Sequence, residues 1–70
     1  MSYTRIDLPD GRWVAVVPND EQTAFGGTVW RKAEDGNWYA DGVTAGHPVT
    51  AADAAAAGPQ IAAVVDAENA

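Results

Sequence analysis

The chain has 70 residues, 47% of them hydrophobic, and a formal net charge of −6 at pH 7. This length predicts one small domain over residues 1–70. Without cysteine, neither disulfides nor a thiolate zinc site can support the fold. No apolar run is long enough to cross a bilayer. No charged and apolar leader opens the chain, so we expect a cytoplasmic protein that does not bind membranes.

The first expected element is a β-hairpin over residues 3–17, with a strong turn signal at Pro9-Asp10-Gly11. Two registers fit this turn. A two-residue Asp10-Gly11 turn places Ile6 and Leu8 on the same face as Trp13, whereas a type I turn that begins at Pro9 places them beside Val14 and Val16. The fixed φ of Pro9 suits the second register. We favour the first because it gathers the larger apolar face.

A second hairpin is expected over residues 28–41, after a long connection at residues 18–27 in which Gly26-Gly27 forms a hinge. If Asp35-Gly36 forms its turn, Trp30, Lys32 and Tyr39 share one face and Trp38 lies on the other. A slip of one residue would exchange these faces, because side chains alternate along a strand.

The last third of the chain is typical of helix, because residues 50–70 include ten alanines and no aromatic or basic residue. Thr50 is the expected N-cap, and Gly58-Pro59 is expected to break the helix in two. Ile61, Val64 and Val65 recur at helical spacing and should dock on the sheet. The predicted fold is therefore α+β: a four-stranded antiparallel sheet of two hairpins at about residues 3–43. A broken C-terminal helix, at about residues 50–67, packs on one face.

Catalysis and cofactor binding are poorly supported by the sequence. The chain has one histidine, His47, which precedes a proline in an expected loop, one serine and no cysteine. Acid–base and nucleophilic catalysis need several such groups within hydrogen-bond reach. The acidic residues of the turns lack the spacing of a calcium loop. We expect neither an enzyme nor a metal or cofactor site.

Residues 49–65 (VTAADAAAAGPQIAAVV) resemble the helix-turn-helix pattern of DNA-binding regulators and excisionases. The order of strands and helix also resembles the arm-binding domains of phage integrases. The resemblance implies DNA binding, but the recognition helix would offer Gln60 and otherwise only apolar or acidic side chains. A net charge of −6 repels phosphates. Direct binding to nucleic acid is therefore not expected.

The aromatic residues give the strongest functional signal. Tryptophan and tyrosine are enriched at the centres of protein interfaces, and the chain has three tryptophans and two tyrosines. Since the helix covers only one face of the sheet, some of these rings should remain exposed. Trp30, Lys32 and Tyr39 are the candidate binding patch.

In size and in its alanine-rich composition, the chain resembles the small accessory proteins of actinobacterial phages. This resemblance implies a protein that binds and modulates a host protein. The expected function is a non-enzymatic protein-binding module. Two alternatives remain: an acidic inhibitor that mimics DNA, and a structural protein that assembles with itself. The expected state is a monomer or homodimer.

Overall fold

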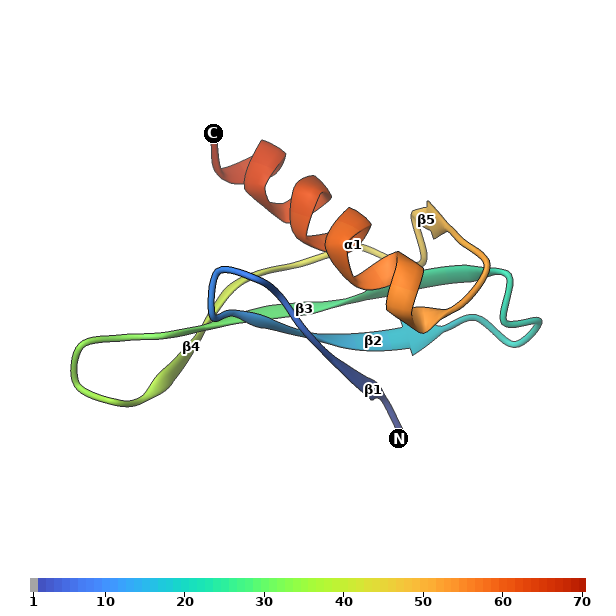
Figure 1. Cartoon of the computed structure of the whole chain (residues 1–70). Helices are drawn as coiled ribbons and strands as arrows, with labels where there is room; N and C mark the ends of the chain where they lie inside the picture. The colour runs from blue at the N-terminus through green and yellow to red at the C-terminus, as the bar shows by residue number, and fades with distance from the viewer. Residues whose placement is uncertain (1) are drawn as a thin grey trace.

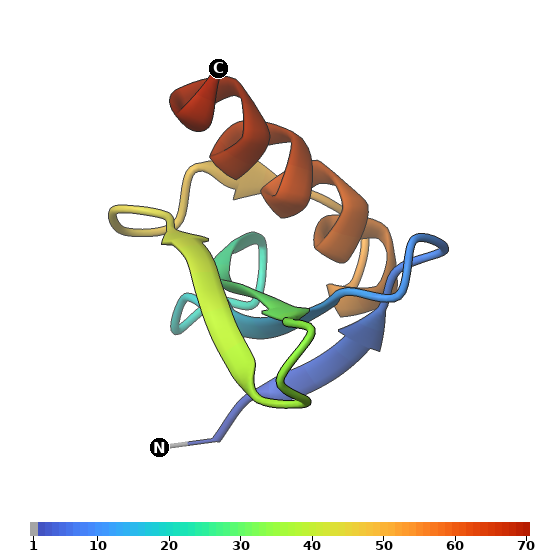
Figure 2. The same cartoon turned by 90° about the vertical axis from the view of Figure 1, so that its left-hand side faces the viewer.

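The computed structural model describes residues 2–70, which form one antiparallel sheet and one helix (Figure 1). The elements are β1 (Thr4–Asp7), β2 (Trp13–Pro18), β3 (Ala24–Lys32), β4 (Trp38–Val43), β5 (Val49–Thr50) and α1 (Ala54–Asn69). The sheet order is β1-β2-β3-β4, and α1 lies across one face of the sheet (Figure 2). The predicted α+β class, with a four-stranded antiparallel sheet and a C-terminal helix, is confirmed. The short strand β5, which pairs with the start of β3, was not predicted.

The two hairpins predicted from the sequence use the same three-residue turn, which ends in Asp-Gly. In the first, the Gly11 amide donates to the Leu8 carbonyl and the Leu8 amide donates to the Arg12 carbonyl. Ala33, Gly36 and Asn37 repeat this arrangement in the second. Gly11 and Gly36 have φ of 93° and 86°, as expected of a type I turn followed by a left-handed residue.

The turn type sets the register of the first hairpin and corrects the prediction. Ile6 pairs with Val14, and Thr4 pairs with Val16. The favoured two-residue turn is wrong and the alternative is right, because Pro9 suits the first central position of a type I turn. Trp13 therefore lies on the face opposite Ile6, away from the helix.

The connection between β2 and β3 is shorter than predicted. β3 begins at Ala24, and Asn19 organises the turn before it by accepting hydrogen bonds from the Thr23 and Ala24 amides. Gly26 and Gly27 lie within β3 and do not form a hinge. A Cβ on Gly26 would overlap the Gly46 carbonyl oxygen, and a Cβ on Gly27 would overlap that of Ala15. These glycines allow backbones to approach closely.

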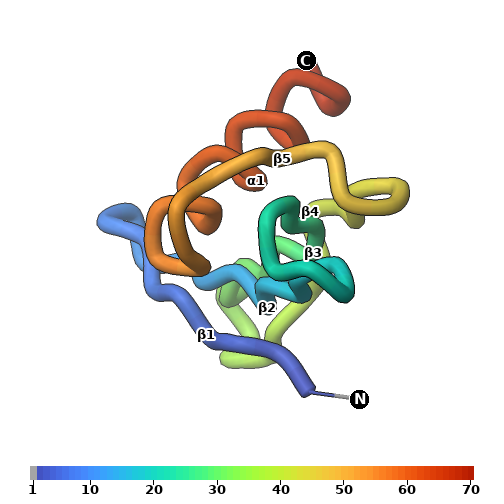
Figure 3. Tube along the Cα trace, turned by 90° about the vertical axis from the view of Figure 1, so that its right-hand side faces the viewer, coloured from blue at the N-terminus to red at the C-terminus, as the bar shows by residue number. Residues whose placement is uncertain are grey.

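The helix is continuous, so the predicted break at Gly58-Pro59 is wrong. Asp53 is the N-cap and accepts a 2.8 Å hydrogen bond from the Ala56 amide. Thr50, the predicted cap, belongs to β5. Gly58 is buried against Ile6, where a Cβ would lie 2.6 Å from the Ile6 Cγ2 atom. The helix thus uses Gly58 to approach β1 rather than to end, and Figure 3 shows the chain passing from β4 through β5 into α1.

The hydrophobic core lies between α1 and the sheet. Ile61 and Val65 of the helix are almost fully buried, and Val64 packs against the core edge, as their spacing predicted. The sheet contributes five buried hydrophobic side chains: Val14, Val16, Phe25, Val29 and Val49. Alternate residues of β2 and β3 point away from this core. Among residues 2–70, the single helix α1 covers the core side of the sheet, and no helix covers the other side.

Candidate binding face

The face of the sheet opposite α1, here called the open face, carries three tryptophans and a tyrosine. Val14 and Val29 point toward the helix, so their neighbours Trp13 and Trp30, which pair with each other, point away from it. Lys32 follows Trp30 on this face, and Trp38 is its cross-strand partner. Tyr3, just before β1, contacts Trp13 from the other side.

The rings form one contiguous cluster centred on Trp13. Its ring centroid lies 6.1 Å from that of Tyr3 and 5.9 Å from that of Trp30, with interplanar angles of 28° and 20°. The Trp38 ring meets Trp13 edge-on, with centroids 6.3 Å apart. Trp13 and Trp30 are partly buried, whereas Tyr3 and Trp38 are 58% and 39% exposed. This much exposed aromatic surface is a feature of binding sites.

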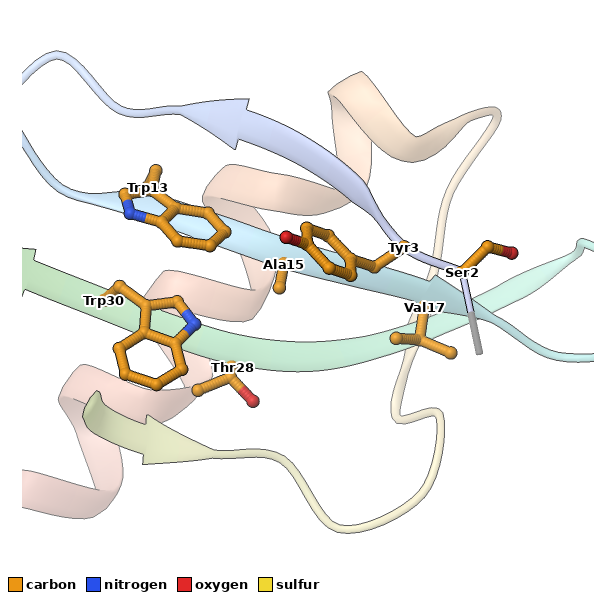
Figure 4. A pocket seen from close by; sticks show the side chains of 7 residues that line it. All are labelled: Ser2, Tyr3, Trp13, Ala15, Val17, Thr28 and Trp30. Atoms are coloured by element: carbon orange, nitrogen blue, oxygen red, sulfur yellow. The ribbon is translucent and has the colours of Figure 1, made fainter. Parts of the chain in front are cut away.

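A hollow of about 340 Å³ lies within this cluster. Figure 4 shows Tyr3 on one side and Trp30 on the other, with the small side chain of Ala15 between them. The residues that line the hollow are Ser2, Tyr3, Trp13, Ala15, Val17, Thr28 and Trp30. None of them is charged. The hollow is therefore an aromatic site with a few hydroxyl groups and an indole N–H at its margin.

The charges on the open face differ in sign from those of the whole molecule. Arg5 lies with its guanidinium carbon 4.6 Å from the Trp13 ring centroid and pairs with Asp7 at 3.1 Å. Lys32 is exposed and has no acidic partner within 4.0 Å among residues 2–70. The face thus carries two cations and one carboxylate in a protein with net charge −6.

The other acidic residues lie in the turns, at the sheet margin and on the helix, and no dense acidic stripe results. Asp35 is an example from the second turn: it accepts hydrogen bonds from the Asn37 amide and the Tyr39 hydroxyl. These bonds lower the pKa of Asp35 below its usual value, the amide contributing most. Its charge therefore stabilises the turn.

Arg12 joins three parts of the fold and was not singled out from the sequence. Its guanidinium contacts Asp10 at 2.8 Å, Asp41 of β4 at 3.0 Å and Asp66 of α1 at 2.9 Å. The hydrogen bond from Arg12 lowers the pKa of Asp66, and the Arg12 backbone amide is the main cause of a lowered pKa at Asp10. Since its donors are taken by carboxylates of this chain, Arg12 is structural.

The structure brings together only part of the predicted patch. Trp30 and Lys32 share the open face, but Tyr39 pairs with Arg31 and lies on the opposite face. There the Arg31 guanidinium carbon is 5.7 Å from the Tyr39 ring centroid. The three-residue turn shifts the register by one residue, so Trp38 takes the place predicted for Tyr39.

Sequence reasoning also missed Tyr3, Trp13 and Arg5. A signal for the correct faces was present, because the second turn reads Glu34-Asp35-Gly36 and the first reads Pro9-Asp10-Gly11. Pro9 suits a type I turn followed by a left-handed glycine, and this turn places Trp13 on the open face. The same turn in the second hairpin places Trp38 on that face.

Trp13 has one unusual feature: its buried indole Nε1 has no hydrogen-bond partner among residues 2–70. Figure 4 shows this nitrogen on the side of the ring away from the hollow. It therefore offers no donor to a ligand there. By contrast, the Trp30 indole nitrogen lies on the side of its ring nearer to Ala15 and Thr28.

Other kinds of site find no support in the described residues. Among residues 2–70, no group of three or more His, Cys, Asp or Glu side chains is placed to hold a metal ion. His47 is exposed in the loop before β5. No helix in this part of the chain has the length and apolar character needed to cross a membrane.

The chain matches no protein-family model, no curated protein and no solved structure.

Proposed function

We propose that this protein is a small, non-enzymatic binding module that docks another protein on the open face of its sheet. One observation carries the proposal: Tyr3, Trp13, Trp30 and Trp38 form a contiguous aromatic cluster on the face that the helix leaves uncovered, and the first three of these rings line a hollow. Aromatic residues at the centre of a desolvated interface supply much of the binding energy of protein complexes.

The energetics of a small domain support a binding role for these rings. The helix-side core already buries nine apolar residues without any tryptophan or tyrosine. Burial of a large apolar side chain contributes about 1.5–3 kcal/mol of stability. Trp38 and Tyr3 contribute much less than this to the fold, because they stay exposed. A partner that covers the open face recovers this energy as affinity.

The resemblance of the composition to accessory proteins of actinobacterial phages suggests a host protein as the partner. Of the alternatives, inhibition by DNA mimicry has less support, because the carboxylates are spread over the turns, the sheet margin and the helix. Self-assembly would pair the sheet or the helix with a second copy of this chain. A mass that rises with protein concentration would distinguish it from binding to another protein.

A pull-down with three matched baits tests the proposal. The baits are the wild type, Trp30→Ala on the open face, and Tyr39→Ala, which removes an exposed aromatic ring from the opposite face. From an actinobacterial lysate, we expect one protein that the wild type and Tyr39→Ala retain and Trp30→Ala loses. Equal capture by all three folded baits, or capture lost only with Tyr39→Ala, would contradict the proposed binding face.

A further inference from the structure

We propose that the hollow on the open face takes a proline-rich segment in the polyproline II conformation, with a carboxylate beside it that pairs with Lys32. This inference rests on the proposed function and names the chemistry of the partner. The hollow has aromatic walls, no charged lining residue and a volume of about 340 Å³, which is enough room for more than one apolar, ring-shaped residue. Aromatic-lined grooves of this kind dock proline-rich segments.

The polar groups at the hollow match the needs of a proline-rich backbone. Such a backbone has carbonyl groups without internal partners and few N–H groups, so its site must donate hydrogen bonds. The Trp30 indole can only donate. It and the Tyr3 hydroxyl have no hydrogen-bond partner among residues 2–70. Figure 4 shows both groups at the margin of the hollow.

The backbone beneath the hollow excludes addition of a strand. Ala15 pairs with Arg5 on one side and with Thr28 on the other, so this part of the sheet has no free edge. A sugar is also a poor fit, since the lining residues include no carboxylate, amide or guanidinium to bind its hydroxyl pairs. An extended peptide that lies across the rings, and whose backbone needs only hydrogen-bond donors from the site, fits better than an added strand or a sugar.

Lys32 supplies the charge complement. It follows Trp30 by two residues on the same face, which places its Cα about 7 Å further along β3. A polyproline II helix rises about 3.1 Å per residue. In a segment that runs along β3 with one proline against Trp30, a carboxylate two or three residues further on therefore reaches the Lys32 ammonium. Arg5, in contrast, is already paired with Asp7 and stacked on Trp13.

Two synthetic peptides test this inference, each with six prolines flanked on both sides by two glutamates or by two lysines. The flanks are symmetric, so the direction of binding need not be known. At 0.15 M salt the net charge of the protein is screened beyond about 8 Å. The charges next to the hollow therefore determine which of the two peptides binds more tightly. In an NMR titration of the full chain, we expect saturable shifts of the Trp30 indole N–H and tighter binding of the glutamate peptide.

Variants assign the contacts. Trp30→Phe keeps a ring but removes the donor, and we expect it to weaken binding about 2- to 12-fold, the range for one hydrogen bond. Lys32→Met should abolish the preference for the glutamate peptide. Tyr39→Ala, on the opposite face, should leave both affinities unchanged.

Three results of the titrations would overturn the inference: no saturable shift with either peptide, binding that folded Trp30→Ala retains, or a preference for the lysine peptide. A dimer in sedimentation analysis that Trp30→Ala dissociates would identify a second copy as the occupant and overturn it too. If the peptides fail but the pull-down still loses a protein with Trp30→Ala, the proposed function stands and only the proline-rich partner is wrong.

Discussion

Gly11 and Gly36 occupy the same position in two equivalent turns, and both have a positive φ. No neighbouring atom would meet a Cβ at either site within 4 Å. The cost of a side chain there is conformational, because residues other than glycine rarely adopt this region.

We expect Gly11→Ala and Gly36→Ala each to lower the free energy of unfolding by about 1 kcal/mol. Gly36→Asn should be milder, because asparagine tolerates the left-handed conformation. Urea denaturation followed by tryptophan fluorescence measures the free energy of unfolding of the wild type and of each variant. Unchanged midpoints for both alanine variants would show that these residues are not held at positive φ.

At the scale of the element, α1 carries a proline in its interior. Pro59 is exposed and follows the buried Gly58, and its ring removes the amide that would bond the Ala55 carbonyl. The rest of the helix holds because Ile61 and Val65 bury against the sheet.

We expect Pro59→Ala to raise the free energy of unfolding by about 1–3 kcal/mol, because alanine restores the amide and suits a helix interior. Thermal unfolding followed by circular dichroism would show a higher Tm. Gly58→Ala provides the contrast: it also improves helix propensity but meets Ile6, so it should lower the Tm. A fall in Tm for Pro59→Ala would mean that the proline is required by the local packing.

The same elements show what could be predicted from the sequence. The helix-side core was predictable because Ile61 and Val65 recur at helical spacing. The break predicted at Gly58-Pro59 was wrong because local propensity favours a break there, whereas the close contact between Gly58 and Ile6 favours a continuous helix. The open face depended on turn type: one residue of register decides whether Trp38 or Tyr39 lies beside Trp30, and periodicity alone carries no information on that choice.

At the scale of the whole molecule, Arg12 connects the first turn, β4 and α1. Asp10 and Asp66 have lowered pKa values in the folded protein because of contacts with Arg12. Lowered folded-state pKa values mean that these pairs stabilise the fold fully above the unfolded value of 3.8. This stabilisation is lost as the pH falls through the lower folded-state values.

We therefore expect Arg12→Met to lower the Tm at pH 7 more than Lys32→Met, which removes an exposed cation with no acidic partner among residues 2–70. The difference in Tm between the two variants should narrow as the pH falls below 3.8, the ordinary pKa of these carboxyl groups. Arg12→Lys should restore only part of the loss, because one ammonium cannot match the guanidinium contacts to three carboxylates. Equal Tm values for the two methionine variants at pH 7 would show that the Arg12 contacts contribute nothing to stability.

The binding role depends on the aromatic rings forming a free face, and the three indole N–H signals test this most directly. A soluble gadolinium chelate broadens NMR signals of exposed groups. We expect strong broadening at Trp38, intermediate broadening at Trp30 and almost none at Trp13, whose Nε1 is buried. We also expect nuclear Overhauser contacts from Trp30 to Trp13. A Trp30 indole protected from the chelate, with contacts to Ile61 or Val65, would place it in the core and contradict the account.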